Sequence, residues 1–448
     1  MAANTVNTES QGWRAVGARP SLPEIHSSLP VPQSSAFLRK LLAFAGPGFL
    51  VAVGYMDPGN WATDLAAGSR YNYTLLSVIM ISNFMAILLQ ALAIKLGIVT
   101  GRDLAQACRD HFSRPVANGL WIFAEIAIAA CDLAEVIGSA IALNLLFHIP
   151  LIVGVCLTAL DVLVILFLQQ KGFRFLEALV ISLIGTIGIC FGLEILFSRP
   201  ELTGLFRGFF IPSAQIVRDP GMLYIAIGIL GATVMPHNLY LHSAIVQTRN
   251  FERTSRGRRE AIRYCTIDST IALTVALFVN AAILIVSAAT FYRTGHHEIA
   301  EIQDAYKLLS PLLGVGAAGT VFALALLASG QNSTLTGTLA GQVVMEGFLN
   351  IRMRPWLRRL ITRLLAIVPA IIVTALWGVR GTASLLVLSQ VVLSMQLSFA
   401  VVPLVMFTSD RQKMGEFVNA AWLKWLSWAT AVFIAVLNGW LLVQAIRS

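Results

Sequence analysis

Long apolar segments limit what this chain can fold into. Eleven of them follow one another from Leu41 onward, and polar loops separate them. Most are close to the length of about 20 residues that an α-helix needs to cross the hydrocarbon core of a bilayer. They run over residues 41–66, 74–98, 117–147, 150–170, 175–197, 221–247, 264–291, 315–346, 358–378, 383–408 and 421–445. The sequence therefore predicts an all-α polytopic membrane protein with eleven transmembrane helices.

The composition is also that of a chain embedded in a lipid bilayer. Of its 448 residues, 57% are hydrophobic and only 12% are charged, whereas soluble domains have about 25% charged residues. This composition excludes a soluble enzyme, a disulfide scaffold, a disordered protein and a coiled coil. The net charge of +9 does not indicate a nucleic-acid partner, because the basic residues gather in loops at one membrane face.

The chain divides into a short tail and one membrane domain. The first 36 residues are polar, rich in Ser and Pro, and contain no apolar stretch. We therefore expect residues 1–36 to form a disordered tail and neither a signal peptide nor a span. Residues 37–448 are predicted to form a single transmembrane domain. It would consist of two repeats, at about 41–197 and 221–408, and an extra helix at 421–445.

Lys and Arg in the loops predict the orientation. Alternate loops on one side are richer in them, and the densest loop lies between the sixth and seventh segments and contains Arg249, Arg253, Arg256, Arg258, Arg259 and Arg263. Cytoplasmic loops carry an excess of Lys and Arg. We therefore expect a multi-pass protein of the cell (inner) membrane, with a cytoplasmic N-terminus and, after eleven spans, a C-terminus outside.

Two apolar segments in corresponding positions of the two halves are interrupted in the same way. The first contains Met56-Asp-Pro-Gly-Asn60 and the sixth contains Val234-Met-Pro-His-Asn238. Proline removes a backbone donor and clashes with the preceding turn, so both helices should unwind near mid-membrane. Unwound backbone is tolerated at that depth only where it lines a polar cavity. Paired interruptions of this kind indicate the substrate site of an inverted-repeat transporter.

The side chains at these breaks suit a transition-metal ion. Asp57 offers a carboxylate, Asn60 an amide oxygen and Met235 a thioether, and unwinding would free the carbonyl groups of Gly54 and Ala232. Oxygen ligands alone favour magnesium or calcium, whereas one soft sulfur shifts the preference toward manganese, iron, cobalt, zinc or cadmium. Met235 could instead be a packed core residue, but a charged Asp57 inside the membrane calls for a cation as its partner.

Further polar residues could move protons. Asp132 and Glu135 share one helix face because they lie three residues apart. A carboxylate pair of this kind suits a proton relay, although it could also be a structural polar network. His237 lies next to Pro236 and could carry a proton, gate the site or only form a hydrogen bond.

The chain resembles the Nramp family (natural resistance-associated macrophage proteins) from about Leu41 to the C-terminus. The motifs that carry the resemblance are Asp57-Pro-Gly-Asn60, Asp132-Leu-Ala-Glu135, Met235-Pro-His-Asn238, Trp356-Leu-Arg-Arg359 and Leu388-Ser-Gln390. Members of this family are proton-coupled importers of divalent transition metals. The resemblance implies a LeuT-type fold with helices 1–5 and 6–10 as inverted repeats. It also implies import of manganese or ferrous iron, and of cadmium, cobalt and zinc.

The resemblance also implies residue roles. The metal ligands would be Asp57, Asn60, Met235, Gln390 and the carbonyl groups of Ala232 and Gly54. The proton pathway would consist of Asp57, Asp132, Glu135 and His237, with Arg358 and Arg359 as cationic partners and Arg363 as a competitor of Arg359. The metal ion would be the substrate, no cofactor is expected, and the protein would be a monomer.

Three other functions remain as alternatives. A sodium- or proton-coupled amino-acid symporter of the same fold would leave Met235 without a role. A passive metal channel would not need two matched broken helices. A membrane metalloenzyme would need several His or Glu ligands, and the sequence contains no HExxH motif. We therefore expect a transporter and not an enzyme.

Overall fold

The computed structural model describes residues 12–14, 20–32, 36–160, 172–297, 301–351, 354–377 and 380–447. The described residues are almost entirely helical. The helices are α1 (Phe37–Phe44), α2 (Pro47–Ala52), η1 (Val53–Met56), α3 (Pro58–Tyr71), α4 (Leu76–Thr100), α5 (Leu104–His111), α6 (Arg114–Phe147), α7 (Leu151–Leu157), η2 (Thr158–Leu160), α9 (Phe173–Ser198), α10 (Leu202–Phe210), α11 (Gln215–Arg218), α12 (Pro220–Thr233), α13 (Pro236–Ile245), η3 (Val246–Thr248), α14 (Ser255–Thr290), η4 (Tyr292–Thr294), α15 (Ile302–Leu313), α16 (Ala318–Leu349), α17 (Pro355–Trp377), α18 (Arg380–Thr408), α19 (Arg411–Met414), η5 (Gly415–Phe417) and α20 (Ala421–Arg447). The strands β1 (Leu29–Pro30) and β2 (Arg249–Asn250) pair in parallel.

Among the described residues, seven helices are long and apolar enough to cross a membrane, and the bent pair Phe37–Phe44 and Pro47–Met56 can be counted as an eighth. The predicted all-α membrane fold is thus confirmed. The number eleven stays a prediction. One reason is that most of the second half of the expected segment 150–170 lies outside the described residues.

The two predicted breaks are present. The first span bends by 46° between α1 and α2, and its helix is interrupted again at Asp57, whose backbone is extended. In the sixth segment α12 ends at Thr233, Met235 is extended, and α13 begins at Pro236. In both cases proline is the first residue of the new helix, where its missing N–H is not needed. The unwound residues are fully buried inside the helix bundle.

Long helices surround the two breaks and approach them closely through glycine. Gly138 of α6 lies against Pro58, and Gly231 of α12 lies against the backbone oxygen of Gln390 in α18. A side chain at either glycine would collide with these neighbours. Small residues at such helix interfaces allow backbones to approach closely in a membrane. The site region is therefore held by packed helices on several sides, and not by loops.

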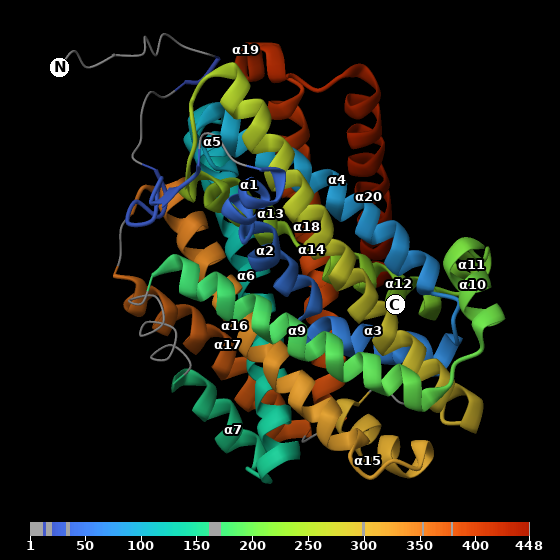
Figure 1. Cartoon of the computed structure of the whole chain (residues 1–448). Coiled ribbons are helices and arrows are strands. Elements are labelled where there is room, and N and C mark those ends of the chain that lie inside the picture. The colour runs from blue at the N-terminus through green and yellow to red at the C-terminus, as the bar shows by residue number, and fades with distance from the viewer. Residues whose placement is uncertain are drawn as a thin grey trace.

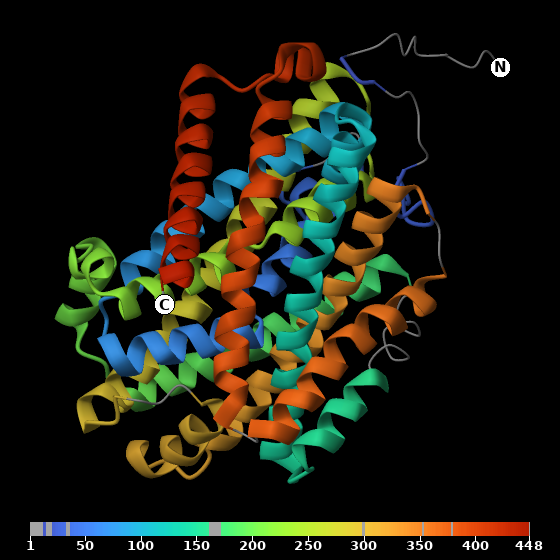
Figure 2. The same cartoon turned by 180° about the vertical axis from the view of Figure 1, so that it is seen from behind.

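Part of the predicted disordered tail has a defined structure. Residues 12–14 and 20–32, which we call the N-terminal strap, lie at the end of the bundle that carries α5 and α19, whereas α7 and α15 lie at the opposite end (Figures 1 and 2). Trp13 and Leu22 of the strap are buried. The expectation of disorder over residues 1–36 is therefore wrong for these two stretches. Specific contacts with the bundle hold these polar stretches in one conformation.

Candidate metal site

Asp57 lies at the first break and ends the unwound stretch. It is the N-cap of α3, and its Oδ1 accepts hydrogen bonds from the backbone N–H of Asn60 at 2.8 Å and from Asn60 Nδ2 at 2.7 Å. An N-cap carboxylate satisfies backbone donors that a helix start leaves free. The second oxygen, Oδ2, is buried and has no hydrogen-bond partner among the described residues. Asp57 can therefore cap its helix with one oxygen and offer the other to a ligand.

Asn60 brings the two breaks together. Its Nδ2 donates to the backbone oxygen of Gly54 at 3.3 Å and to that of Ala232 at 3.1 Å, besides Asp57 Oδ1. The last carbonyl groups of a helix lack partners within it, and Ala232 lies at the end of α12 where this applies. Three oxygens from the two broken spans thus lie around one amide nitrogen. Gly54 and Ala232 were predicted to act through their backbone carbonyl groups, and these are the atoms that lie here.

Gln390 reaches the site from α18. Its side chain packs against Gly59, where a Cβ would collide with the amide nitrogen. Gln390 Oε1 is buried and accepts no hydrogen bond from any described residue. The structure therefore places Gln390 beside the first break, against Gly59, which follows Asp57 by two positions.

Met235 occupies the second break, with an extended backbone at φ −77° and ψ 127°. Its side chain is buried in a small apolar cluster with Ala127 and Cys131 of α6 and Leu393 of α18. This is the packed environment that the sequence left open as an alternative. Leu393 lies one helical turn from Gln390 on α18. Met235 therefore packs against the same part of α18 that carries Gln390.

The residues predicted for the proton pathway lie on α6, α13 and α17, besides Asp57 at the start of α3. Asp132 and Glu135 are buried on α6, and both approach Gly337 of α16, where a Cβ would lie 3.3 Å from Asp132 Oδ1 and 3.0 Å from Glu135 Oε1. Glu135 accepts a hydrogen bond from Ser333 Oγ at 2.7 Å. The two carboxyl groups therefore face the same short stretch of α16.

His237 connects the second break to these carboxyl groups through Cys131. The Cys131 Sγ lies 3.7 Å from His237 Nε2 and 3.6 Å from Glu135 Oε1. Arg358 and Arg359, the predicted cationic partners, belong to α17, and their side chains and that of Arg363 lie outside the described part of the structure.

Two residues of the site were not predicted. Asn280 of α14 donates to the backbone oxygen of Tyr55 at 2.7 Å and to Asn60 Oδ1 at 3.4 Å. Cys131 is the other, through its contacts with His237 and Glu135. The available signals were the single amide of Asn280 in the apolar segment 264–291 and the spacing of four residues between Cys131 and Glu135.

The donors at the breaks are a carboxylate, amides, backbone carbonyl groups and a thioether. The described residues contain no group of three or more His, Cys, Asp and Glu side chains that could hold a metal ion. A resident zinc site of the usual type is built from such side chains. The arrangement around Asp57 differs from such a site, because Asp57 is the one charged side chain among these donors.

The family pattern described as "Natural resistance-associated macrophage protein-like" matches residues 48–444 of the chain. The chain belongs to this family. Its similarity to individual Nramp proteins covers most or all of its length. It is 64% identical over 448 residues to the "Divalent metal cation transporter MntH" of Listeria monocytogenes strain EGD-e, covering 100% of both chains. It is 68% identical to the protein of that name from Nostoc sp., covering 96% of this chain and 97% of the relative.

Solved structures agree with this membership. The manganese transporter of Eremococcus coleocola, crystallised with an aromatic bis-isothiourea compound, superimposes with a TM-score of 0.88 at 44% identity, covering 94% of this Nramp chain and 90% of the transporter. Mhp1, a nucleobase-cation-symport-1 family transporter, superimposes with a TM-score of 0.60 at 15% identity, covering 90% of this chain and 92% of its own. The latter likeness concerns the fold alone. The predicted Nramp family and LeuT-type fold are thus confirmed.

Proposed function

We propose that this Nramp protein is a secondary active transporter that imports divalent transition-metal ions, manganese and ferrous iron in particular, together with protons. The observation that carries the proposal is the convergence of Asp57 Oδ1, Gly54 O and Ala232 O on Asn60 Nδ2 between the two broken helices. The relatives named divalent metal cation transporter and the manganese transporter structure support it.

In this proposal an ion binds where the two breaks meet. Asp57 supplies the negative charge, Asn60, Gly54 and Ala232 supply neutral oxygens, and Met235 and Gln390 complete the ligand set. Asn60 must turn its amide so that Oδ1 and not Nδ2 faces the ion, because a cation takes oxygen and not N–H donors. The single sulfur of Met235 makes the site softer than an all-oxygen site and favours manganese, iron or cadmium over calcium and magnesium.

We propose that protons leave the ion site through α6. His237, Cys131 and Glu135 form a continuous series of contacts at 3.7 Å and 3.6 Å, and Asp132 follows next to Glu135 at Gly337. Metal binding favours ionised Asp57 and displaces its proton into this series. Arg358 and Arg359 cannot shuttle a proton because arginine stays charged, but they can stabilise an ionised carboxyl group.

The membrane orientation belongs to the same proposal. The end of the bundle with α5, α19 and the start of α14 carries many basic residues, including Arg102, Arg109, Arg256, Arg258 and Lys413. By the positive-inside rule this end is cytoplasmic. The N-terminus would then lie inside the cell and the C-terminus outside, in the inner membrane of the cell. All candidate ligands come from one chain, which fits a monomer.

Transport by purified protein in liposomes tests the proposal. Manganese entry is followed with a fluorophore that the ion quenches, while a pH dye reports proton entry in the same vesicles. We expect manganese uptake that an inward proton gradient accelerates, with proton entry that depends on the metal. Absence of uptake would contradict metal transport. Uptake without metal-stimulated proton entry would contradict only the coupling.

A further inference from the structure

The N-terminal strap begins with a tryptophan held between cations and aromatic rings. Trp13 is buried, and the Arg102 guanidinium and the Lys413 ammonium lie 4.9 Å and 5.1 Å from the centre of its ring system. Its indole also packs edge-on against Phe407 of α18 at 5.5 Å between ring centres. Aromatic and cation–π contacts of this kind stabilise a docked segment. They fasten the strap to α18 and to the loops before α5 and around α19.

The middle of the strap is fastened to α5 and α16. Ser21 Oγ donates to Asp103 Oδ2 at 2.7 Å, and the backbone N–H of Leu22 donates to Glu346 Oε2 at 2.9 Å. Asp103 is also the N-cap of α5. Leu22 is 2% exposed and has a positive φ of 53°, a conformation that costs energy for a residue other than glycine. These contacts fix one backbone conformation at the end of α16.

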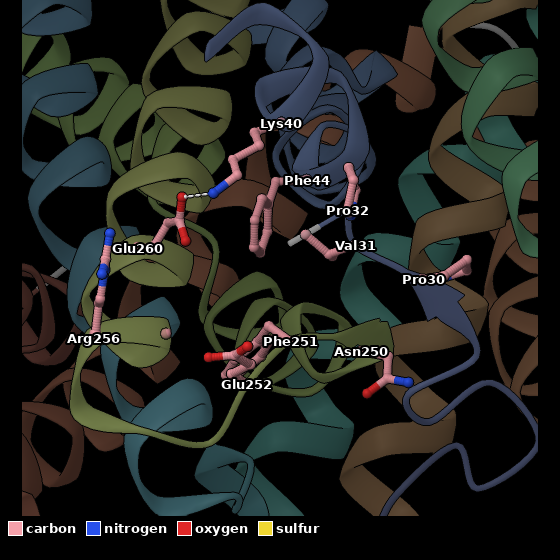
Figure 3. Close-up of a pocket in the computed structure, with 11 residues that line it drawn as sticks. Pro30, Val31, Pro32, Lys40, Phe44, Asn250, Phe251, Glu252, Arg256 and Glu260 are labelled. Carbon is pink, nitrogen blue, oxygen red and sulfur yellow. Dashed lines mark hydrogen bonds and ion pairs between the residues drawn. The ribbon is translucent and has the colours of Figure 1, made fainter. Parts of the chain in front are cut away.

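The last part of the strap reaches the chain that follows the second broken helix. The backbone N–H of Ser27 donates to Gln247 O at 2.9 Å, and Leu29 and Pro30 pair with Arg249 and Asn250 as β1 and β2. Figure 3 shows Pro30, Val31 and Pro32 on one side of a cavity of about 460 Å³. On its other sides lie Phe44 and the Lys40–Glu260 ion pair, which joins α1 to α14.

The strap therefore connects two groups of elements that alternating access must separate. One group consists of parts of the two broken spans and the chain after the second: α1, α13, η3 and β2. The other includes α5 and the end of α16. Ten residues before Glu346 on α16, Thr336 Oγ1 donates to the backbone oxygen of Leu50 in α2 at 2.9 Å. Alternating access in inverted-repeat transporters moves one group of helices against the other around a fixed site. Any opening at this end must break contacts of the strap.

We propose that the N-terminal strap is a latch that holds this end of the transporter closed, and that its release precedes or accompanies the separation of α2 from α16. The proposal rests on the proposed function, since only a carrier needs such an opening. The latch acts on the equilibrium between closed and open forms and contributes no ligand to the ion site.

A cysteine at Thr336 tests the latch without measuring transport. Thr336 is 1% exposed, so a maleimide can react with Thr336→Cys only when α2 and α16 separate. Cys156 is the exposed cysteine of the five, and Cys156→Ser removes its background. In this background we expect Trp13→Ala to raise the labelling rate of the detergent-purified protein at least threefold. Ser21→Ala should raise it about twofold.

Ser28→Ala is the matched control. Ser28 Oγ donates at 2.7 Å only within the strap, to Ile25 O, so this variant should label at the parental rate. Manganese affinity, measured by calorimetry, should differ less than twofold between the variants if they are folded. Equal labelling rates in the parent, Trp13→Ala and Ser21→Ala would overturn the latch. The failure of the proposed function would appear separately, as a parent that takes up no metal.

Discussion

Gly138 of α6 lies directly against Pro58, the first residue of α3, so that a Cβ on Gly138 would collide with Cβ and Cγ of the proline. This contact fixes the position of the first break relative to α6. We expect Gly138→Ala to displace Pro58 and Asp57 and to reduce metal uptake in liposomes at least tenfold. Overpacking a well-packed interior costs about 1–3 kcal/mol, so thermal stability should also fall.

Gly119 provides the control on the same helix. A Cβ there would meet nothing within 4 Å. Gly119→Ala should therefore retain parental uptake and stability. Parental uptake by Gly138→Ala would mean that α6 does not hold the break in place.

Replacing Asp57 with Asn separates its role as the cap of α3 from its proposed role as the charged metal ligand. Asn can still accept the hydrogen bonds from Asn60 through its single side-chain oxygen, so Asp57→Asn should keep the cap of α3 and the fold. It cannot supply the negative charge that a buried divalent cation needs. We expect manganese binding, measured by calorimetry on purified protein, to weaken at least a hundredfold, with a melting temperature close to that of the parent. Near-normal binding would remove Asp57 from the ligand set.

Met235 should determine the selectivity of the site for soft over hard metal ions. In Met235→Ala the carboxylate and carbonyl oxygens stay, and only the thioether is lost. We expect cadmium affinity to fall at least tenfold more than manganese affinity, and calcium to become a competitor of manganese uptake. The measurement is competition of each ion with manganese in liposomes. If calcium stays excluded as strongly as in the parent, the apolar cluster around Met235, and not its sulfur, is what matters.

The carboxyl groups of α6 should control the proton and not the metal. We expect Glu135→Gln and Asp132→Asn to retain measurable manganese binding but to lose metal-stimulated proton entry. Gln and Asn keep the size of the side chain, so the packing against Gly337 is preserved. Metal and proton entry are followed in the same liposomes across a series of pH values. Parental proton flux in both variants would place the route elsewhere, with His237 as the first residue to examine.

The latch should loosen in acid. Burial and then the charge of Arg253 lower the pKa of His26 below its usual value of 6.5. Burial and then the charges of Lys413 and Arg14 lower the pKa of His111, against the opposite effect of Asp410. Release of the strap frees His26 from its burial and from Arg253, and removes the Arg14 charge from His111, so both pKa values rise toward 6.5. The released form therefore binds more protons, and the docked strap is at full strength above about pH 6.5 and weakens as the pH falls below it.

Labelling of Thr336→Cys measures this pH dependence. Relative to a free thiol standard, the labelling rate should rise between pH 7.5 and pH 5.5. His26→Gln together with His111→Gln should remove most of the rise. An unchanged rise in the double variant would assign it to groups elsewhere in the protein.

Local sequence signals predicted the breaks but not their surroundings. Asp57 and Met235 each precede a proline inside an apolar segment, and proline acts on its own neighbours, so both interruptions could be located without knowing the fold. Asn280 shows only an amide inside an apolar segment, and its partner Asn60 lies 220 positions away in the chain. Its role depends on how α14 packs against α3, which no short motif encodes.

The strap was mispredicted for a related reason. Serine, proline and few apolar residues are typical of disordered segments, and this is how residues 1–36 were interpreted. The docking of residues 21 and 22 depends on Asp103 and Glu346, which lie 82 and 324 positions away. A polar segment can thus be ordered by partners that composition does not reveal.

The hydrogen bonds of Asn60 have a consequence for the return of the empty transporter to the state that binds a new ion. Its amide N–H₂ group binds the oxygens of Asp57, Gly54 and Ala232, which in the proposed site would be the partners of a cation. Unpaired buried polar groups are costly in free energy. With the Asn60 amide as their partner, these buried oxygens are not left unpaired when the transporter is empty. In the proposed site the Asn60 amide would thus take the place of the ion, and its rotation would distinguish the loaded from the unloaded protein.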